Sequence, residues 1–216
     1  MKKIGFLVAM DEEYRALREA GLSSPGKSLV FKQTGMGKVN AARAATELIL
    51  TERPDAVIGT GVAGGMMEAM RTGDLVIASC VAHHDVWCGE GNAPGQVQGL
   101  PQRFDADRRL LDAAVFASGG FMGGVFTGLV ASGDQFFISL EEDDRIRSLY
   151  PDVLAADMEA ASIAQVCHLY GIPFLNIRII SDIHTSAEVQ KASYSDFWRG
   201  FSGENMKFLE KMLERI

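Results

Sequence analysis

The stretch Val153–Asp182, "VLAADMEAASIAQVCHLYGIPFLNIRIISD", contains one complete strand, helix and strand pattern. A short apolar run ends at Asp157, a helical pattern rich in small residues follows over 158–170, and Gly171 and Pro173 interrupt it. A second apolar run, "FLNIRIIS", comes next. Two parallel strands need a long crossover connection, which is usually a helix. The stretch therefore predicts an α/β fold.

The same alternation continues along the rest of the chain. Strands are expected near 3–9, 29–34, 55–61, 73–83, 124–132, 153–157 and 173–181. Helices are expected near 11–21, 38–52, 107–118, 139–149, 158–170 and 193–215. Such alternation is typical of a mainly parallel sheet with helices on both faces. Because 216 residues suit one sizeable core, we expect a single domain over 1–216.

Composition and charge exclude several classes of partner. Hydrophobic residues make up 47% of the chain and charged residues 23%, which is typical of a folded globular protein. The net charge is −7 and Lys and Arg form no dense cluster, so we expect no nucleic-acid partner and no membrane partner. The apolar run Ile4–Met10 is too short to span a bilayer and leads directly into acidic residues, which predicts neither a signal peptide nor a membrane segment.

The cysteines indicate a reducing compartment. They are odd in number and have no CxxC spacing, so neither a disulfide framework nor a zinc ribbon is indicated: Cys80, Cys88 and Cys167. A cytoplasmic location is therefore expected. A nearby group could supply metal ligands but lacks a second cluster, and we expect no metal: His83, His84, Asp85 and Cys88.

Polar residues follow three of the expected strands, in "VAMDEE", "AADMEAAS" and "NIRIISD". If the strands are parallel, the carboxyl ends meet on one rim, where ligands bind in open α/β sheets. This brings together Glu12 or Glu13, Asp157, Glu159, Arg178, Ser181 and Asp182. The first acidic run and Asp157 also suit helix N-termini, since acids there cap free N–H groups and favour the dipole. Arg178 interrupts a strand that is otherwise fit for burial, so it needs a carboxylate partner or a polar pocket.

Two glycine-rich runs stand out: "GMGKVNAA" from Gly35 and "GTGVAGGM" from Gly59. The first lacks the full spacing of a phosphate-binding loop, and the second matches GxGxxG without the acidic residue that a dinucleotide site requires. Both runs predict that the backbone closely approaches a ligand or another backbone.

The least regular stretch is "VWCGEGNAPGQVQGLPQR", residues 86–103. Ordered loops of this length are usually functional or interfacial. Its Trp87 and Leu100 would be poorly placed in solvent in a monomer, which indicates a partner subunit.

Seven motifs in order, "VAMDEE", "GMGKVNAA", "GTGVAGG", "GDLVIA", "SGDQF", "ADMEAASIAQVC" and "IRIISD", resemble the 5′-methylthioadenosine/S-adenosylhomocysteine nucleosidase family of the nucleoside phosphorylase superfamily. The resemblance covers nearly the whole chain. It implies a three-layer α/β/α sandwich around a mixed, partly barrel-like sheet, and a homodimer in which the 86–101 loop lies near the partner's pocket. It also implies hydrolysis of a purine nucleoside to adenine and a 5-thioribose, without metal or cofactor.

The resemblance assigns roles to individual residues. Glu13 matches the acid that activates water, Arg178 would help to hold that water, and Asp182 matches the residue that protonates or hydrogen-bonds adenine N7. Glu159 matches the carboxylate that binds the ribose hydroxyls, and Phe136 matches the aromatic that stacks on the base. The further substrate-binding positions are Ala63, Gly64, Phe137 through its backbone, Met158 beside the sugar, Ser181, and Tyr194 at the 5′ substituent.

The chain departs from the family pattern at several places. Val62 stands where the family usually has a hydroxyl residue that helps to hold the water, and Asp157 stands where the family commonly has Glu. The segment between Leu22 and Val30 is shorter than usual, and the 86–101 loop lacks the usual aromatic residues. A hydrolase for futalosine or another 5′-modified nucleoside therefore competes with the first assignment. The sequence also leaves open a nucleoside phosphorylase and a non-catalytic nucleoside sensor.

Overall fold

The computed structural model describes residues 1–136, 140–183 and 204–216, so the expectations for Phe137 and Tyr194 lie outside the described residues. Eight strands in this part of the chain form one sheet: β1 Lys3–Val8, β2 Ser28–Gln33, β3 Ala56–Gly65, β4 Leu75–His83, β5 Arg103–Asp105, β6 Val125–Ser132, β7 Val153–Asp157 and β8 Phe174–Ile183. All seven strands expected from the sequence are present, and the short β5 is an addition. It was not predicted because three residues are too few to show a period.

The sheet closes on itself and is mixed, with five parallel and three antiparallel pairings among the described strands, which confirms the partly barrel-like sheet that the resemblance implied. Its order is β2-β1-β3-β7-β6-β4-β5, and β8 pairs with both β3 and β4, so β3, β7, β6, β4 and β8 form a closed barrel. β7 runs antiparallel to β3, and β8 runs antiparallel to β4. The pattern of strands and helices does not reveal this closure, because one strand takes part in two pairings. β3 is ten residues long, its first half pairs with β1, and Gly64 and Gly65 at its end pair with β7.

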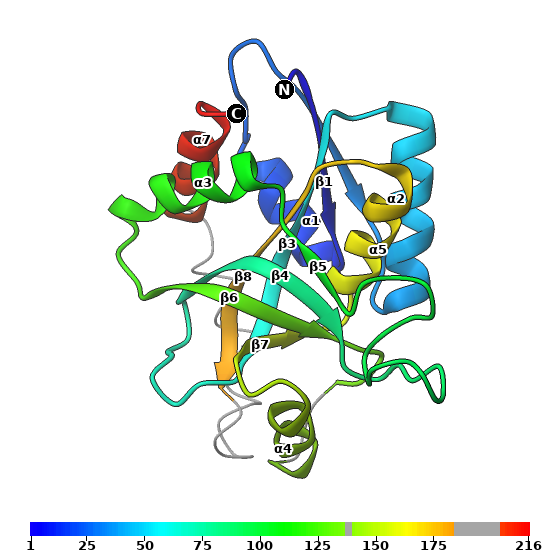
Figure 1. Ribbon diagram of the computed structural model, residues 1–216. Helices are drawn as coiled ribbons and strands as arrows, with labels where there is room; N and C mark the ends of the chain where they lie inside the picture. Colours follow the sequence, from blue (N-terminus) through cyan, green and yellow to red (C-terminus); the bar gives the residue numbers. More distant parts are fainter. Residues whose placement is uncertain (137–139, 184–203) are drawn as a thin grey trace.

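Helices cover both faces of the sheet (Figure 1). Helices α2 (Lys38–Glu52) and α5 (Ala160–Tyr170) lie side by side on one face, and their alanines belong to a core cluster shared with β3, β4 and β8. Helices α1 (Asp11–Glu19), α3 (Arg108–Ala117) and α7 (Glu204–Leu213) contribute to a second cluster on the other face. The expected three-layer α/β/α arrangement is therefore confirmed.

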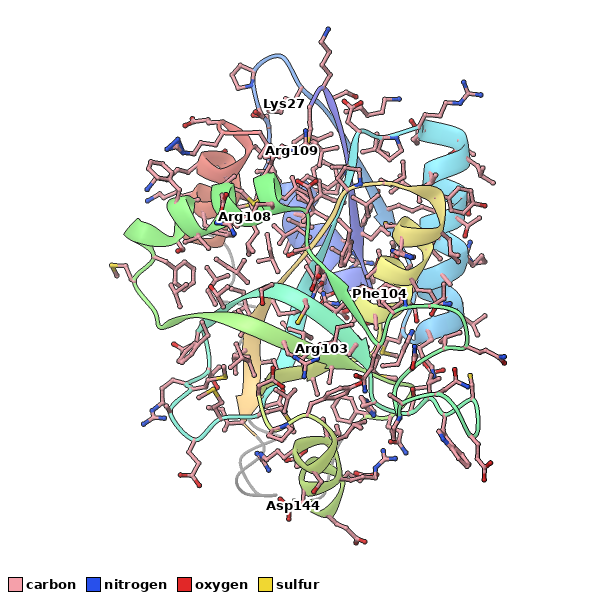
Figure 2. The ribbon with its side chains drawn as sticks, in the orientation of Figure 1. Lys27, Arg103, Phe104, Arg108, Arg109 and Asp144 are labelled. Carbon is pink, nitrogen blue, oxygen red and sulfur yellow. The ribbon has the colours of Figure 1, made fainter. Side chains whose placement is uncertain are left out.

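The remaining elements lie at the edges of this arrangement. Helix α4 (Leu140–Leu149) packs near the barrel through Ile146 and the neighbouring Tyr150, and η1 (Ser118–Gly120) extends α3. Of the helix expected over 193–215, the structure describes only α7. Lys27, labelled in Figure 2, donates to the carbonyl oxygens of Met1 and Ile216, which holds the two termini together. No helix within the described residues has the length and apolar character needed to cross a membrane.

Candidate active site

A pocket opens where the carboxyl ends of β1, β3, β7 and β8 meet beside the 133–136 segment. Its lining residues combine apolar walls with four carboxylates: Ala9, Met10, Glu13, Met36, Val62, Ala63, Gly64, Gln135, Phe136, Ala156, Asp157, Met158, Glu159, Ser181 and Asp182. The convergence that the sequence predicted therefore occurs. Its cause is barrel closure, since the end of β7 meets the end of β3 in antiparallel register.

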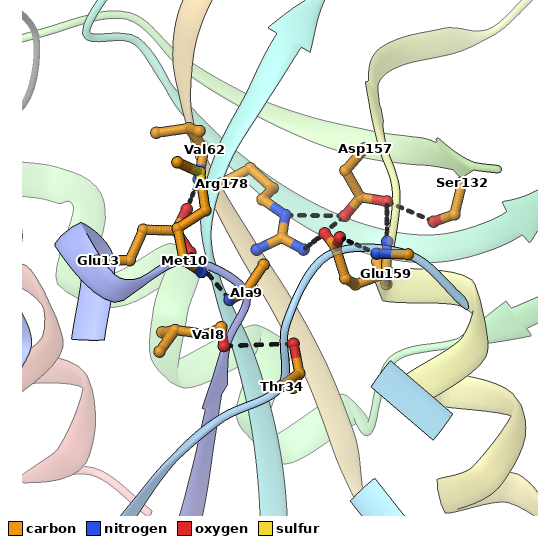
Figure 3. Close-up of polar contacts among 12 residues, drawn as sticks. Val8, Ala9, Met10, Glu13, Thr34, Val62, Ser132, Asp157, Glu159 and Arg178 are labelled. Atoms are coloured by element: carbon orange, nitrogen blue, oxygen red, sulfur yellow. Dashed lines mark hydrogen bonds and ion pairs between the residues drawn. The ribbon is translucent and has the colours of Figure 1, made fainter. Parts of the chain in front are cut away.

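Glu13 lies in the first turn of α1 and points back into the pocket. Its Oε2 accepts N–H groups of Ala9 and Met10, each at 2.9 Å, and its Oε1 accepts the N–H of Val62 at 3.0 Å (Figure 3). The bond to the N–H of Met10 caps the helix. Glu13 therefore has both the capping role considered from the sequence and a place in the pocket. Burial raises the pKa of Glu13, although Arg178 and the three N–H groups oppose this effect.

Arg178 is almost fully buried between these carboxylates, as Figure 3 shows with Glu13 on one side and Asp157 and Glu159 on the other. Its Nε and Nη2 contact Asp157 Oδ2 at 2.8 and 2.6 Å, and Nη2 lies 3.7 Å from Glu159 Oε2. Burial lowers the pKa of Arg178, but the three carboxylates outweigh it and leave the pKa raised. The arginine therefore has the carboxylate partners that the sequence required.

Asp157 performs two tasks at the start of α5. Its Oδ1 accepts the N–H groups of Glu159 and Ala160 at 3.3 and 3.2 Å and the Ser132 hydroxyl at 2.5 Å. Its Oδ2 binds Arg178. These two N–H bonds agree with the capping role that the sequence suggested for Asp157.

Glu159 reaches away from the helix that it begins. Its Oε1 accepts the N–H of Gly37 at 2.9 Å, from the glycine-rich run that starts at Gly35. Gly37 has a φ of +90°, a conformation that favours glycine, so this run does approach another group closely through its backbone. Burial and the neighbouring Asp157 charge raise the pKa of Glu159 to about 7.

Ser181 and Asp182 are displaced into the pocket by an irregularity between β3 and β8. Ala63 pairs with Ile180 and Gly64 pairs with Asp182, so Ser181 is an extra residue on β8. The Ser181 hydroxyl donates to Asp182 Oδ1 at 2.5 Å and lies 3.4 Å from the Ala63 carbonyl oxygen. The bulge therefore turns two successive polar residues toward the same rim.

Most of the predicted site residues line this pocket: Glu13, Ala63, Gly64, Phe136, Met158, Glu159, Ser181 and Asp182. Arg178 lies behind the lining and acts on it through its carboxylate partners. Phe136 is 66% exposed at the pocket edge. The second glycine-rich run packs against the same group, because a Cβ at Gly61 would overlap Glu13 Oε1 and lie 2.9 Å from Arg178 Nη1.

Sequence reasoning missed several contributors. Ala9, Met10, Met36 and Gln135 line the pocket, and no role was assigned to them although they lie within the quoted motifs "VAMDEE", "GMGKVNAA" and "SGDQF". Val62 also lines the pocket, and its backbone N–H donates to Glu13. Ser132 was not singled out, although "VASGD" places a hydroxyl at the end of a strand, which is a signal that could have found it.

The described residues offer no group of three or more His, Cys, Asp and Glu side chains arranged to hold a metal ion. His83 Nε2 donates to Gln165 Oε1 at 2.9 Å. Burial lowers the pKa of His84 to about 4.

Comparison with known proteins agrees with this geometry. A model of the phosphorylase superfamily matches residues 3–216. The 5′-methylthioadenosine/S-adenosylhomocysteine nucleosidase of Anoxybacillus flavithermus is 36% identical over 99% of this chain and 98% of its own length. The crystal structure of the Neisseria meningitidis nucleosidase of the same name, in complex with methylthio-immucillin-A, superposes with a TM-score of 0.90 at 36% identity, over 100% of both chains.

Futalosine hydrolase of Helicobacter pylori is also similar, with a TM-score of 0.87 at 26% identity over 100% of this chain and 98% of that one. Hydrolases whose names give different nucleoside substrates therefore share this fold. The superfamily match over nearly the whole chain and the identity to the nucleosidases decide the membership. The chain belongs to the 5′-methylthioadenosine/S-adenosylhomocysteine nucleosidase family of the phosphorylase superfamily.

Proposed function

We propose that this protein hydrolyses the N-glycosidic bond of 5′-methylthioadenosine, S-adenosylhomocysteine or both, and releases adenine and a 5-thioribose. The observation that carries the proposal is one pocket that holds three buried carboxylates in different surroundings, Glu13, Glu159 and Asp182. An N-glycosidic bond breaks through an oxocarbenium-like state, which needs a base on water and an acid at the leaving group. The names of the relatives support the same reaction.

Glu13 is the proposed base, and one of its oxygens suits the task. A carboxylate has about four acceptor sites, two on each oxygen. The two N–H groups of Ala9 and Met10 occupy those of Oε2, whereas within the described residues Oε1 accepts one bond, from the N–H of Val62, and keeps a site for a water proton. The raised pKa brings Glu13 closer to neutrality, where a general base works best.

Asp182 is the proposed acid at the adenine. This role is supported by the bulge at Ser181, which brings Asp182 into the pocket lining, where the Ser181 hydroxyl donates to Asp182 Oδ1. Phe136 at the pocket edge is an aromatic surface on which a purine ring can stack. Asp182 and Phe136 together define the side of the pocket that we propose for the adenine ring.

Glu159 is the proposed ligand of the ribose hydroxyls. Its Oε1 is held by the Gly37 N–H, and its Oε2 lies 3.7 Å from Arg178, too far for a strong hydrogen bond. This oxygen is therefore able to accept from a sugar hydroxyl. Met158 supplies an apolar wall beside it.

The charges around Arg178 favour water over phosphate as the nucleophile. Phosphorolysis requires a cationic site for phosphate, but the Arg178 guanidinium is already surrounded by Asp157, Glu159 and Glu13. A phosphate dianion beside Glu13 would be repelled, whereas neutral water would not. The proposal is therefore hydrolysis rather than phosphorolysis.

The test uses the purified protein with methylthioadenosine, S-adenosylhomocysteine, inosine and futalosine, each with and without phosphate. Chromatography with mass spectrometry identifies the released base and sugar. We expect phosphate-independent release of adenine from the first two substrates, and a loss of at least ~10²-fold in kcat for Glu13→Gln. Formation of a sugar 1-phosphate, or full activity of Glu13→Gln, would overturn the assignment.

A futalosine-type hydrolase is the second candidate. It is favoured by the likeness to the Helicobacter pylori futalosine hydrolase and by Val62, a pocket-lining residue that stands where the nucleosidases usually have a hydroxyl. The same substrate panel separates the two candidates. A kcat/KM for futalosine above that for methylthioadenosine would select the second.

The protein is also proposed to work as a homodimer through the face formed by α2, α5 and the 86–101 loop. Large apolar side chains are exposed there: Met36 at 59%, Val39 at 78% and Trp87 at 70%. A groove between them is lined by Val86, Val97 and Val166. Sedimentation velocity tests this proposal, since Val39→Asp should shift a dimer toward monomer and a monomeric unmodified protein would contradict it.

We propose two broader properties as well. Residues 1–216 are expected to act as one domain, which is supported by α7 at the end of the chain packing in the same core cluster as β1. A cytoplasmic location is supported by three cysteines without disulfides. Limited proteolysis tests the single domain, and a stable large fragment would contradict it. Cell fractionation tests the location, and recovery of the protein outside the cytoplasm would contradict it.

A further inference from the structure

Two segments that are distant in the sequence both contribute to the pocket lining and contact each other. Met36 and Gly37 precede α2, and the Gly37 N–H holds Glu159. Gln135 and Phe136 follow β6. The spacing between these segments determines how Glu159 and Phe136 stand relative to each other, although β6 and α2 are far apart in the sequence.

Lys38, Asp85 and Asp134 join the two segments in a closed ring, called here the bracket. Lys38 Nζ contacts Asp85 Oδ1 at 2.7 Å, and Asp85 Oδ2 accepts the N–H of Asp134 at 2.9 Å. Asp134 Oδ1 in turn accepts the N–H of Lys38 at 2.7 Å. Every link is charge-assisted, which makes such bonds about twice as strong as neutral ones.

The Lys38–Asp85 pair of the bracket is partly shielded from solvent, whereas Asp134 is exposed. The side chains of Lys38 and Asp85 are 22% and 16% exposed, whereas ordinary surface ion pairs are weakened by water. Burial raises the pKa of Asp85, but Lys38 and the Asp134 N–H outweigh it and leave the pKa lowered. Asp85 therefore stays ionised at neutral pH and keeps both links.

Glycines allow the segments to come this close. A Cβ at Gly37 would lie 2.9 Å from Asp134 Oδ1, and a Cβ at Gly133 would overlap the His84 ring and lie 2.9 Å from Asp85 Cγ. A larger residue at either position would force the neighbouring Asp134, His84 or Asp85 side chain to move. The glycines at 37 and 133 and the bonds of the bracket therefore both indicate a close approach between the segment before α2 and the segment after β6.

We propose that Lys38, Asp85 and Asp134 are positioning residues that set the spacing of the two pocket-lining segments and thereby the affinity for the nucleoside. None of the three lines the pocket, so they act through Gly37, Glu159 and Phe136. This inference rests on the proposed roles of Glu159 and Phe136. A segment that is displaced weakens binding of the substrate and of the transition state alike, so the effect belongs in KM rather than kcat.

Lys38→Met tests the bracket, because it removes the ammonium and keeps most of the apolar stem. We expect KM for methylthioadenosine to rise about tenfold, with kcat changed by less than about threefold. Lys38→Arg keeps a cation and should restore most of the affinity. The matched control is Lys32→Met, which breaks the Lys32–Glu47 pair, also 2.7 Å long and with a 26% exposed lysine, away from the pocket.

A second variant separates positioning from folding. Asp85→Asn keeps the side-chain shape and loses the charge, and the double variant Lys38→Met/Asp85→Asn should raise KM no more than the larger single change, because both break the same ring. Melting temperatures of all variants are measured in parallel. If Lys38→Met raises KM no more than Lys32→Met while its melting temperature falls, the bracket only supports the fold and the inference is wrong.

The outcome is distinguishable from failure of the proposed function. If the unmodified protein releases no adenine, the proposed function fails, and calorimetric titration with adenine itself then tests the bracket. An affinity for adenine that falls about tenfold in Lys38→Met, but not in Lys32→Met, supports the bracket. Equal affinities in both variants, or no affinity in the unmodified protein, overturn it.

Discussion

Replacing Glu159 by Gln is expected to stabilise the protein and to damage its activity. The carboxylate is buried beside Asp157, and burial together with that charge raises its pKa from an ordinary value of 4.5 to about 7. The folded protein thus binds this proton more tightly than the unfolded chain. Ionised Glu159 destabilises the fold above pH 7, and the penalty fades as the pH falls from about 7 to about 4.5.

The size of the effect follows from the pKa. At about 1.4 kcal/mol per pH unit, a rise from 4.5 to about 7 corresponds to roughly 3 kcal/mol at pH 8. Gln keeps an oxygen for the Gly37 N–H, but its NH₂ would face Arg178 in place of Oε2, which reduces the gain. We therefore expect a stabilisation of about 1–3 kcal/mol at pH 8, or about 3–10 °C in melting temperature.

The assay is thermal unfolding of both proteins between pH 4.5 and pH 8.5. The difference in melting temperature should be near zero at the acid end, grow through the range and level off above about pH 7. Glu90→Gln, at an exposed position of the 86–101 loop, is the control and should show no such dependence. Activity is measured alongside, and kcat/KM for methylthioadenosine should fall by at least about 10²-fold, because a neutral amide makes weaker hydrogen bonds to the ribose hydroxyls than a carboxylate does.

Two results would refute this reasoning. A variant that is less stable than the unmodified protein at pH 8 would mean that Glu159 is held ionised by Arg178 and contributes to stability. A difference in melting temperature that does not change with pH would mean that the carboxyl does not titrate in this range. Retained affinity for substrates with intact 2′- and 3′-hydroxyls would contradict the sugar-binding role alone.

Three further substitutions test the surroundings of the site. Gly61→Ala should reduce kcat by at least ~10²-fold, because φ is +143° and the new methyl would overlap Glu13 Oε1, and steady-state kinetics that match the unmodified protein would contradict this. Asp157→Asn should lower the free energy of unfolding by roughly 3 kcal/mol in urea titrations, because it weakens the compensation of the buried Arg178 charge; an unchanged midpoint would oppose it. Asn176→Val should raise the melting temperature by about 2–6 °C, because neither side-chain polar atom of this buried amide has a hydrogen-bond partner among the described residues, and a lower value would count against that cost.

Much of the local structure could be predicted from the sequence. Apolar runs and helical periods located seven strands, and the acids at 11–13 and 157 marked the starts of α1 and α5 because caps depend on neighbouring residues. Arg178 was identified as needing a partner, because an isolated charge in an apolar strand is costly wherever the strand lies. The candidate site could be assembled from motifs because strand ends share a rim.

The direction of the strands and the partners of each charge were decided only by the tertiary structure. Gly37 and Glu159 are 122 residues apart, and Val62 and Glu13 are 49 residues apart, so no local pattern reports these bonds. The bracket of Lys38, Asp85 and Asp134 is equally invisible along the chain. Periodicity records which side chains are buried, whereas barrel closure depends on long-range register between strands, and that register is what brings the carboxylates around one arginine.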